Sequence, residues 1–577
     1  MKTEKKNSKE RLEFFRALYE NAKEAYTDTL DEFDKNIEQY SGSLEIDGGK
    51  EKAITTRNIT YEIIESQISS DIPQPKADAS SYSEERERAA HAIESLCRSL
   101  RDKLPFEEMN DLDERYTYIY GGSVWFVEWD STADFGDVTG GVRVHCLSPK
   151  DFIPQPNVYS IRDMEYCFLR FVTTRSELTR KYGIKDEDTY LADFETTCAT
   201  FDGSDTVSII FCFYRCESGD VSEYAFSGDL TLLDIENYYK RKTKVCKACN
   251  ETENSCSCVG KKSFKTIDID YEDVIDEKNG RLIKKVPYYI PKSLPIVIRR
   301  NTSREKSLLG QSDCKYIRPE QQAINKIESR ILQKLLRSGV TPIVPEDASI
   351  TMNNSIFGQV IKMKPGETMA QYGKVDTTPD ISQDIAEAER LYNHAKRILG
   401  ISDAYQGISE GANESGVARQ IRISQASGRL ESKRKMKYTA YANLDRLIFE
   451  HYLAFADEPR TISYKDAYGR MHNANFNRYD FLIYDMSKMG FRYDDSYLFS
   501  VDLNGGAEYQ RESLWEKNLE NLKAGTLGDP SSPIALLRYW QCQERAHYPY
   551  ARENVEYFSE IVKKGDEVYG ENSRVFI

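Results

Sequence analysis

The stretch LLGQSDCKYIRPEQQAINKIESRILQKLLRS, residues 308–338, decides how the second half of this chain is organised. From Ser312 onward its apolar side chains recur every three or four positions, at Ile317, Ile324, Ile327, Ile331, Leu332 and Leu335. This spacing predicts an amphipathic helix over 312–338. Gly339 follows as a C-terminal stop, and Pro319 predicts either a helix start at that point or a kink.

The residues after this helix predict a small insert and a second helix that returns from it. The insert, 341–380, is rich in turn residues and short strands, and a helix over 382–399 ends at Gly400. A small-residue polar loop over 401–416 then leads into a very long helix over 417–456. Shorter helices are expected from Ala507 to the end.

The first half predicts helices followed by strands. Residues 11–40 have the spacing of a long amphipathic helix, and two more helices are expected over 56–70 and 83–102. From Tyr116 to about Asn301 the character changes to β-branched and aromatic strands, of which YIYGGSVWFVEW, residues 118–129, is the clearest. The expected fold class is therefore α+β.

Composition narrows the classes of function. The chain has 577 residues, 40% of them hydrophobic and 30% charged, which allows a large core and excludes wholesale disorder. Its net charge of -15 argues against a protein that grips DNA tightly, because such affinity comes largely from neutralising phosphates. The Lys/Glu-rich start excludes a secretory signal, and no 18-residue apolar stretch predicts a membrane span.

Four of the twelve cysteines form the one local motif with metal chemistry. Cys246 and Cys249 have Cys-x-x-Cys spacing, and Cys256 and Cys258 follow after a short polar spacer. Four thiolates would fill the tetrahedral shell of zinc, which predicts a structural and not a catalytic site. A flexible loop of reduced cysteines or a redox pair is the alternative. The scattered remaining cysteines suit reduced thiols in a cytoplasm better than a disulfide framework.

Enzyme signatures are weak. The chain has no Gly-x-Gly-x-x-Gly, P-loop, His-Glu-x-x-His or Gly-x-Ser-x-Gly motif, and its six histidines lie far apart. The acid run over 267–273 alternates with apolar residues, which favours an exposed strand over a two-metal nuclease site. We therefore expect no catalytic residues.

Several short motifs, in their order along the chain, resemble the portal proteins of tailed bacteriophages. The turn Gly310-Gln-Ser-Asp313 before a long helix, with Gln321-Gln-Ala-Ile-Asn-Lys326 inside it, is similar to the family's pattern. So are LSPKDFIP at 147–154, SIRD at 160–163, GISD at 400–403 and ESGVAR at 414–419. Each motif is only moderately specific, and their order and spacing carry the resemblance over nearly the whole chain.

The resemblance implies a ring, usually of twelve subunits, around a channel for double-stranded DNA. It divides the chain into N-terminal helices and a β-rich wing, a stem of two helices, a clip, a tunnel loop, a long helix with the C-terminal wing, and a crown. These parts correspond to residues 1–311, 312–340 with 381–400, 341–380, 401–416, 417–506 and 507–577. The zinc-knuckle insert expected at 240–262 from the cysteine spacing lies within the wing and is absent from many portals. The implied partners are the terminase large subunit, a head–tail adaptor, and the major capsid and scaffolding proteins. The implied place is the portal vertex of a virion assembled in the bacterial cytoplasm, without a membrane.

Two groups of residues are candidates for the channel. The loop 401–416 carries three acids and no Lys or Arg, which suits a duplex that must slide, and its candidate channel residues are Asp403, Tyr405, Gln406, Glu410, Asn413 and Glu414. The start of the long helix is basic, and Arg419, Arg422, Lys433 and Arg434 are candidates for contacts to DNA or to a neighbouring subunit. A solvated helix face is the alternative for this second group.

Two other functions stay open. One is another minor head or connector protein of a phage, and the other is a zinc-containing enzyme that processes nucleic acid. The mass of the purified assembly separates a portal from the enzyme, because a portal assembles into a ring.

Overall fold

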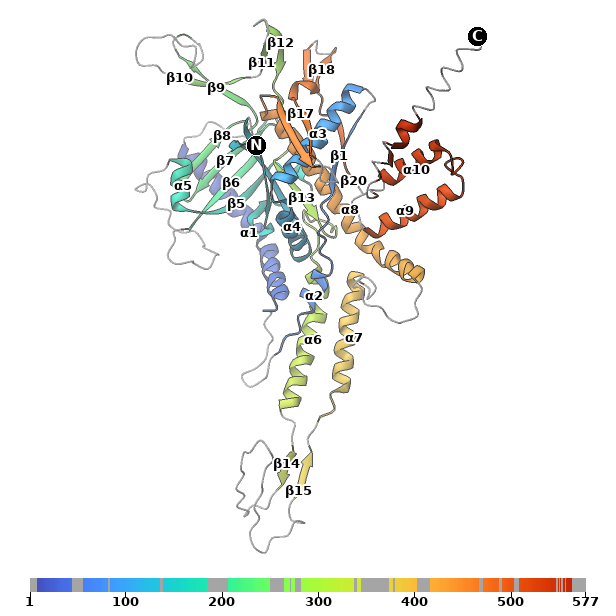
Figure 1. The fold of residues 1–577 in the computed structure, drawn as a ribbon. Coiled ribbons are helices and arrows are strands. Elements are labelled where there is room, and N and C mark those ends of the chain that lie inside the picture. The colour runs from blue at the N-terminus through green and yellow to red at the C-terminus, as the bar shows by residue number, and fades with distance from the viewer. Residues whose placement is uncertain are drawn as a thin grey trace.

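A computed structural model gives the structure of most of the chain. It describes residues 8–43, 55–80, 84–134, 138–183, 206–247, 249, 264–269, 271–275, 282–336, 340–343, 373–376, 379–401, 416–465, 471–486, 490–502, 508–545, 548, 551, 554–555 and 557–562. The chain is a mixture of helices and mainly antiparallel sheets, so the expected α+β class is confirmed. Figure 1 shows a broad body from which a pair of helices projects.

A three-stranded antiparallel sheet forms the centre of the body. Its strand order is β13 (Ile296–Arg300), β2 (Gly122–Asp134), β3 (Thr139–Leu147). Trp125 and Val127 of β2 face the main core, where they meet α3 (Glu84–Lys103), α4 (Phe106–Tyr120) and the C-terminal half of α8 (Gly416–Phe455). The alternate residues of β2 face the other way, as the two-residue period of a strand requires.

A five-stranded sheet covers that second face. Its strands run in the order of the sequence: β4 (Phe152–Pro154), β5 (Tyr166–Thr174), β6 (Thr206–Arg215), β7 (Val221–Ser227) and β8 (Leu230–Ile235). The long helix α1 (Ser8–Ser41) packs on this sheet through Phe15, which stacks on Tyr224 at 4.2 Å between ring centroids. The short helix α5 (Arg175–Tyr182) follows β5 and packs beside it.

The projecting hairpin is formed by α6 (Asp313–Leu336) and α7 (Ser382–Leu399), which lie side by side (Figure 1). Its tip carries the two-stranded ribbon of β14 (Val340–Ile343) and β15 (Gly373–Asp376). At its root, Ile317 and Ile324 of α6 pack against Ala395 and Leu399 of α7 and against α2 (Ile59–Glu65). Near the tip, Asp384 of α7 accepts hydrogen bonds from Arg330 and Lys334 of α6.

The remaining elements are peripheral hairpins, one strand pair and two helices. The hairpins are β9 (Arg241–Cys246) with β10 (Phe264–Ile269), β11 (Tyr271–Ile275) with β12 (Leu282–Pro287), β16 (Arg460–Lys465) with β17 (Met471–Phe476), and β18 (Leu482–Asp485) with β19 (Gly490–Tyr493). Strand β1 (Gln74–Ala79) pairs with the distant β20 (Tyr497–Asp502). The helices α9 (Glu508–Lys523) and α10 (Pro533–Arg545) pack on each other.

The predicted long helices are confirmed over 11–40, 312–338, 382–399 and 417–456, within a few residues at each end. One prediction is wrong. Residues 118–120 belong to α4 and not to a strand, because the buried face of α4 continues to Tyr120 and the left-handed Gly121 then ends the helix. One element was not predicted: strand β1 forms between the helices expected over 56–70 and 83–102, because β20 supplies a partner strand from far along the chain.

A close backbone contact joins the end of α4 to the segment before α6. Gly121 has a φ of 93°, and a Cβ atom on it would lie 2.4 Å from the carbonyl oxygen of Gly310. Gly183 ends α5 in the same left-handed conformation, with a φ of 67°, but a Cβ there would meet nothing within 4 Å. Both glycines therefore have the positive φ that disfavours other residues, and they differ in whether a Cβ atom would clash with a neighbour.

Replacing these two glycines by alanine should separate the two effects. Gly183→Ala should lower the free energy of unfolding by about 1 kcal/mol through backbone strain alone. Gly121→Ala should cost roughly 3 kcal/mol, since it adds a clash with backbone that has no flexible atom to move. Urea unfolding of both full-length variants measures the difference, and equal costs would contradict the close contact.

Candidate functional site

The sequence-predicted channel residues lie mostly outside the described part of the chain. Asp403, Tyr405, Gln406, Glu410, Asn413 and Glu414 all fall in the segment 402–415, which the structure does not describe. Arg419 and Arg422 belong to α8, but only their backbone is described and their side chains are not. The side chain of Arg434 is exposed on α8. The predicted roles of these residues stay predictions.

Lys433, the remaining candidate on α8, forms contacts within its own chain. Its ammonium group donates to the carboxylate of Asp313, at the first residue of α6, and to the side-chain oxygen of Gln67 at 3.1 Å. The side chain retains only 12% of its exposure. It also lies 5.0 Å from the centre of the Tyr118 ring, a cation–π distance. Lys433 thus binds within its own chain and does not lie on a solvated face, and its predicted contact to DNA or a neighbouring subunit stays a prediction.

Asp313 is the acceptor at the centre of this contact. Besides Lys433 it accepts from the side-chain amide of Gln67 at 3.1 Å and from that of Asn301 at 2.7 Å. Asn301 follows β13, and Gln67 follows α2, so three segments converge on the first turn of α6. A carboxylate at a helix N-terminus also interacts favourably with the helix dipole. The Gly-x-Ser-Asp turn therefore fixes where α6 leaves the body.

A second buried cluster of ion pairs lies next to this one, one helical turn along α8. Lys437 of α8 pairs with Glu114 of α4 at 2.9 Å, and Arg299 of β13 pairs with both Glu114 and Asp113. Asp113 also accepts from the indole nitrogen of Trp125 at 2.9 Å. The two carboxylates and Arg299 are at most 1% exposed. We call the residues Asp113, Glu114, Arg299, Asp313, Lys433 and Lys437 the junction network.

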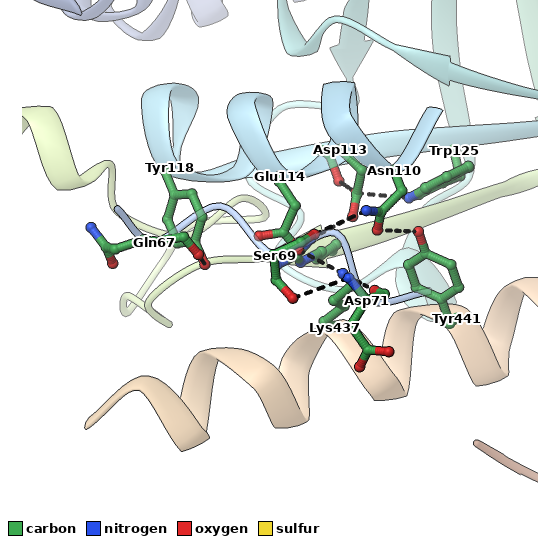
Figure 2. Close-up of polar contacts among 12 residues, drawn as sticks. Gln67, Ser69, Asp71, Asn110, Asp113, Glu114, Tyr118, Trp125, Lys437 and Tyr441 are labelled. Atoms are coloured by element: carbon green, nitrogen blue, oxygen red, sulfur yellow. Dashed lines mark hydrogen bonds and ion pairs between the residues drawn. The ribbon is translucent and has the colours of Figure 1, made fainter. Parts of the chain in front are cut away.

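Figure 2 shows the neutral groups that complete this network. Lys437 donates a further hydrogen bond to the backbone oxygen of Asp71 at 2.6 Å. Asn110 of α4 donates to the backbone oxygen of Ser69 at 3.0 Å and accepts from the hydroxyl of Tyr441 at 3.0 Å (Figure 2). The segment 67–71 is therefore held between α4 and α8.

The charges of the junction network stabilise one another. Burial alone would favour the neutral form of Glu114, but Arg299 and Lys437 outweigh it and hold the pKa of this carboxyl below its usual value. Burial also opposes the charge of Arg299, and Asp113 and Glu114 outweigh it, which raises the pKa of the guanidinium well above its usual value. Three cations thus face three carboxylates in this network.

The junction network holds elements of the fold in place and has no features of a catalytic site. The six charged groups are paired with one another, and no group of them forms a nucleophile next to a base. Sequence reasoning found Lys433 and the Gln-Ser-Asp turn but missed Asp113, Glu114 and Arg299. The sequence gives one indication of their role: each of the three occupies a position that the apolar pattern of its helix or strand predicts to be buried.

The structure describes two of the four cysteines of the predicted zinc site. Cys246 is buried at the end of β9, opposite Phe264 of β10, and Cys249 is exposed, while Cys256 and Cys258 lie outside the described residues. Among the described side chains, three or more metal-binding residues nowhere come together as a metal site. The four-cysteine zinc site therefore stays a prediction. Seven other described cysteines, Cys97, Cys146, Cys167, Cys212, Cys216, Cys314 and Cys542, form no disulfide.

Removing Lys437 should reveal the strength of the junction network. Lys437→Met leaves Glu114 buried with one cation instead of two, which should lower the free energy of unfolding by roughly 3 kcal/mol. Because the folded pKa of Glu114 is depressed, the contribution is present at neutral pH and is lost as the pH falls through the acidic range.

Urea unfolding at pH 7 and at acidic pH tests this expectation. Lys435→Met is the matched control on the same helix, since Lys435 is exposed and pairs with Glu431 one turn away. It should cost about 0.5 kcal/mol or less. Equal losses in the two variants would show that the network adds no stability.

Of the helices that the structure describes, none combines the length and apolar character needed to cross a membrane. A scan of the chain against models of known protein families finds no match, and a search among curated proteins finds none either.

Proposed function

We propose that this chain is the portal subunit of a tailed bacteriophage, which forms the ring-shaped DNA channel at one vertex of the capsid. The observation that carries the proposal is the projecting hairpin of α6 and α7, which joins a β-rich body and bears a small β-ribbon at its tip (Figure 1). The long helix α8 follows it after the segment 402–415. This is the element order that the resemblance implies for stem, clip, stem, tunnel loop and long wing helix.

The charge of the chain supports a channel that does not hold DNA tightly. In the proposed ring the acidic segment 401–416 faces a duplex that must slide, and its carboxylates repel phosphate. Two of the cations on α8, Lys433 and Lys437, are used inside the subunit. Arg419, Arg422 and Arg434 remain as the candidates for contacts to DNA or to a neighbouring subunit. The chain acts in this proposal as a non-enzymatic assembly protein.

The junction network has a defined task in this proposal. It fixes α6 and α8 to the same point of the body, so that the helices of the stem and the residues between them keep one orientation. In a ring, identical orientation in every subunit is what makes a regular channel. The tip ribbon of β14 and β15 is then presented away from the body, where the terminase motor and a head–tail adaptor are proposed to dock.

The purified chain should assemble into rings. Analytical ultracentrifugation should give a mass near twelve times the subunit mass of 66.5 kDa. Electron microscopy of the same sample should show closed particles with a central hole. A monomer or dimer under all conditions would favour an enzyme, and an open or solid oligomer would favour another connector protein.

We also propose that the cysteine insert beyond β9 binds a structural zinc ion through Cys246, Cys249, Cys256 and Cys258. Metal analysis of the purified chain should then find about one zinc per subunit. The double variant Cys246→Ser/Cys249→Ser should lose it, because two of four thiolate ligands are gone. The double variant Cys216→Ser/Cys542→Ser lies outside the motif and should keep it. A wild-type preparation without metal would exclude the zinc site.

A further inference from the structure

The two main sheets of the body meet through aromatic side chains. Phe126 of β2 lies 5.9 Å from Phe171 of β5 and 5.5 Å from Phe213 of β6, measured between ring centroids. His145 of β3 is paired in register with Phe126 and stacks on its ring, with 6.2 Å between ring centroids. The three-stranded sheet and the five-stranded sheet therefore face one another at this point.

Each sheet places a glutamate next to this aromatic contact. Glu128 lies two residues beyond Phe126 on β2 and thus on the same face of the three-stranded sheet. Glu223 of β7 is paired in register with Phe213 of β6, so these two side chains share a face of the five-stranded sheet. The two carboxyls are close enough for their charges to repel each other.

The other ionisable groups around this pair are few. The Nε2 atom of His145 lies 3.2 Å from the carboxylate of Glu128. Helix α5 contributes Lys181, whose charge acts on Glu223, and Tyr182, whose hydroxyl is near both glutamates. Tyr238, after β8, is also near both. Farther along β2 and β3, Asp130 and Arg143 pair with each other at 2.6 Å, and the buried His451 of α8 interacts with Glu128.

We propose that this contact between the sheets, which we call the carboxyl joint and define by Glu128, His145, Lys181 and Glu223, is a proton-sensitive switch. Proton binding to Glu223 closes the joint, and loss of that proton loosens the packing of β7 and α5 against β2 and β3. The proposal goes beyond the proposed portal function and does not depend on it.

The geometry explains why Glu223 is the sensitive group. Glu223 is 7% exposed, so its carboxyl is largely removed from water. Glu128, by contrast, keeps about a third of its exposure and has His145 as a partner. Burial first, and the charge of Glu128 second, raise the pKa of Glu223 to about 7. A proton on Glu223 removes both the desolvation cost and the repulsion.

The direction of the pH effect follows from this raised pKa. The unfolded or opened state releases its proton at the usual value near 4.5, whereas the closed state keeps it up to about pH 7. The closed joint is therefore fully favoured below pH 4.5, loses stability as the pH rises from 4.5 to 7, and changes little above that.

Hydrogen exchange of the full-length protein between pH 5 and pH 8 tests the switch. After correction for the intrinsic pH dependence of exchange, the amides of β7 and α5 should open more often at pH 8, by a factor on the order of 100. Glu223→Gln should abolish this dependence, since the amide is neutral throughout. Glu217→Gln changes an exposed carboxylate in the adjoining turn and should leave the wild-type dependence intact.

Glu128→Gln provides the second variant. It removes the repelling charge but leaves Glu223 buried, so a smaller pH dependence should remain. The proposal is overturned if the opening of β7 in the wild type does not depend on pH, or if Glu128→Gln and Glu217→Gln behave alike. It is also overturned if Glu223→Gln folds and keeps the wild-type pH dependence.

Discussion

The whole arrangement depends on six charges buried where α4, α6, α8 and β13 meet. Each buried charge costs several kcal/mol to take out of water, and this cost is offset only when partners stand at hydrogen-bonding distance. Asp113, Glu114 and Asp313 have such partners in Arg299, Lys437 and Lys433. A shift of any one element by an ångström or two would leave a charge unpaired. The network thus permits one relative placement of these four elements and penalises the others.

This constraint controls a large part of the molecule because of where its members lie in the sequence. The ion pair between Lys433 and Asp313 joins residues 120 positions apart. Between them lie α6, the tip ribbon, α7 and the first turns of α8. This ion pair therefore joins the two ends of the segment that contains the projecting hairpin. The apolar packing of Ile317 and Ile324 on α7 and α2 holds the root of the hairpin in place. Purely apolar contacts would give stability with less control of direction, since they are not directional.

The sequence predicts the elements of this structure better than their junction. Helical spacing is a local property, so α1, α6, α7 and α8 follow from periodicity alone. The junction network does not, because charged residues such as Lys433 and Lys437 in a basic stretch are typical of a solvated face. Only the fold shows that the cations at these two positions meet carboxylates from other elements. Strand β1 was missed for the same reason, as its partner β20 lies over 400 residues away. The likeness to a known family predicted the order of the elements but no contact between them.

Two buried carboxyls in this chain show how the same group can serve opposite purposes. Glu114 is held between Arg299 and Lys437, its pKa is lowered, and it stays charged over the neutral range, so its contacts do not change with conditions. Glu223 is also buried, but the largest charge effect on it comes from another glutamate, Glu128, and its pKa rises to about 7. The contacts of Glu114 therefore stay the same over the neutral pH range, whereas those of Glu223 depend on pH in that range. The junction network lies at the root of the projecting hairpin, and the carboxyl joint lies between the two sheets of the body. In the proposed switch, the packing of the five-stranded sheet therefore changes with pH, while the contacts of the junction network stay the same.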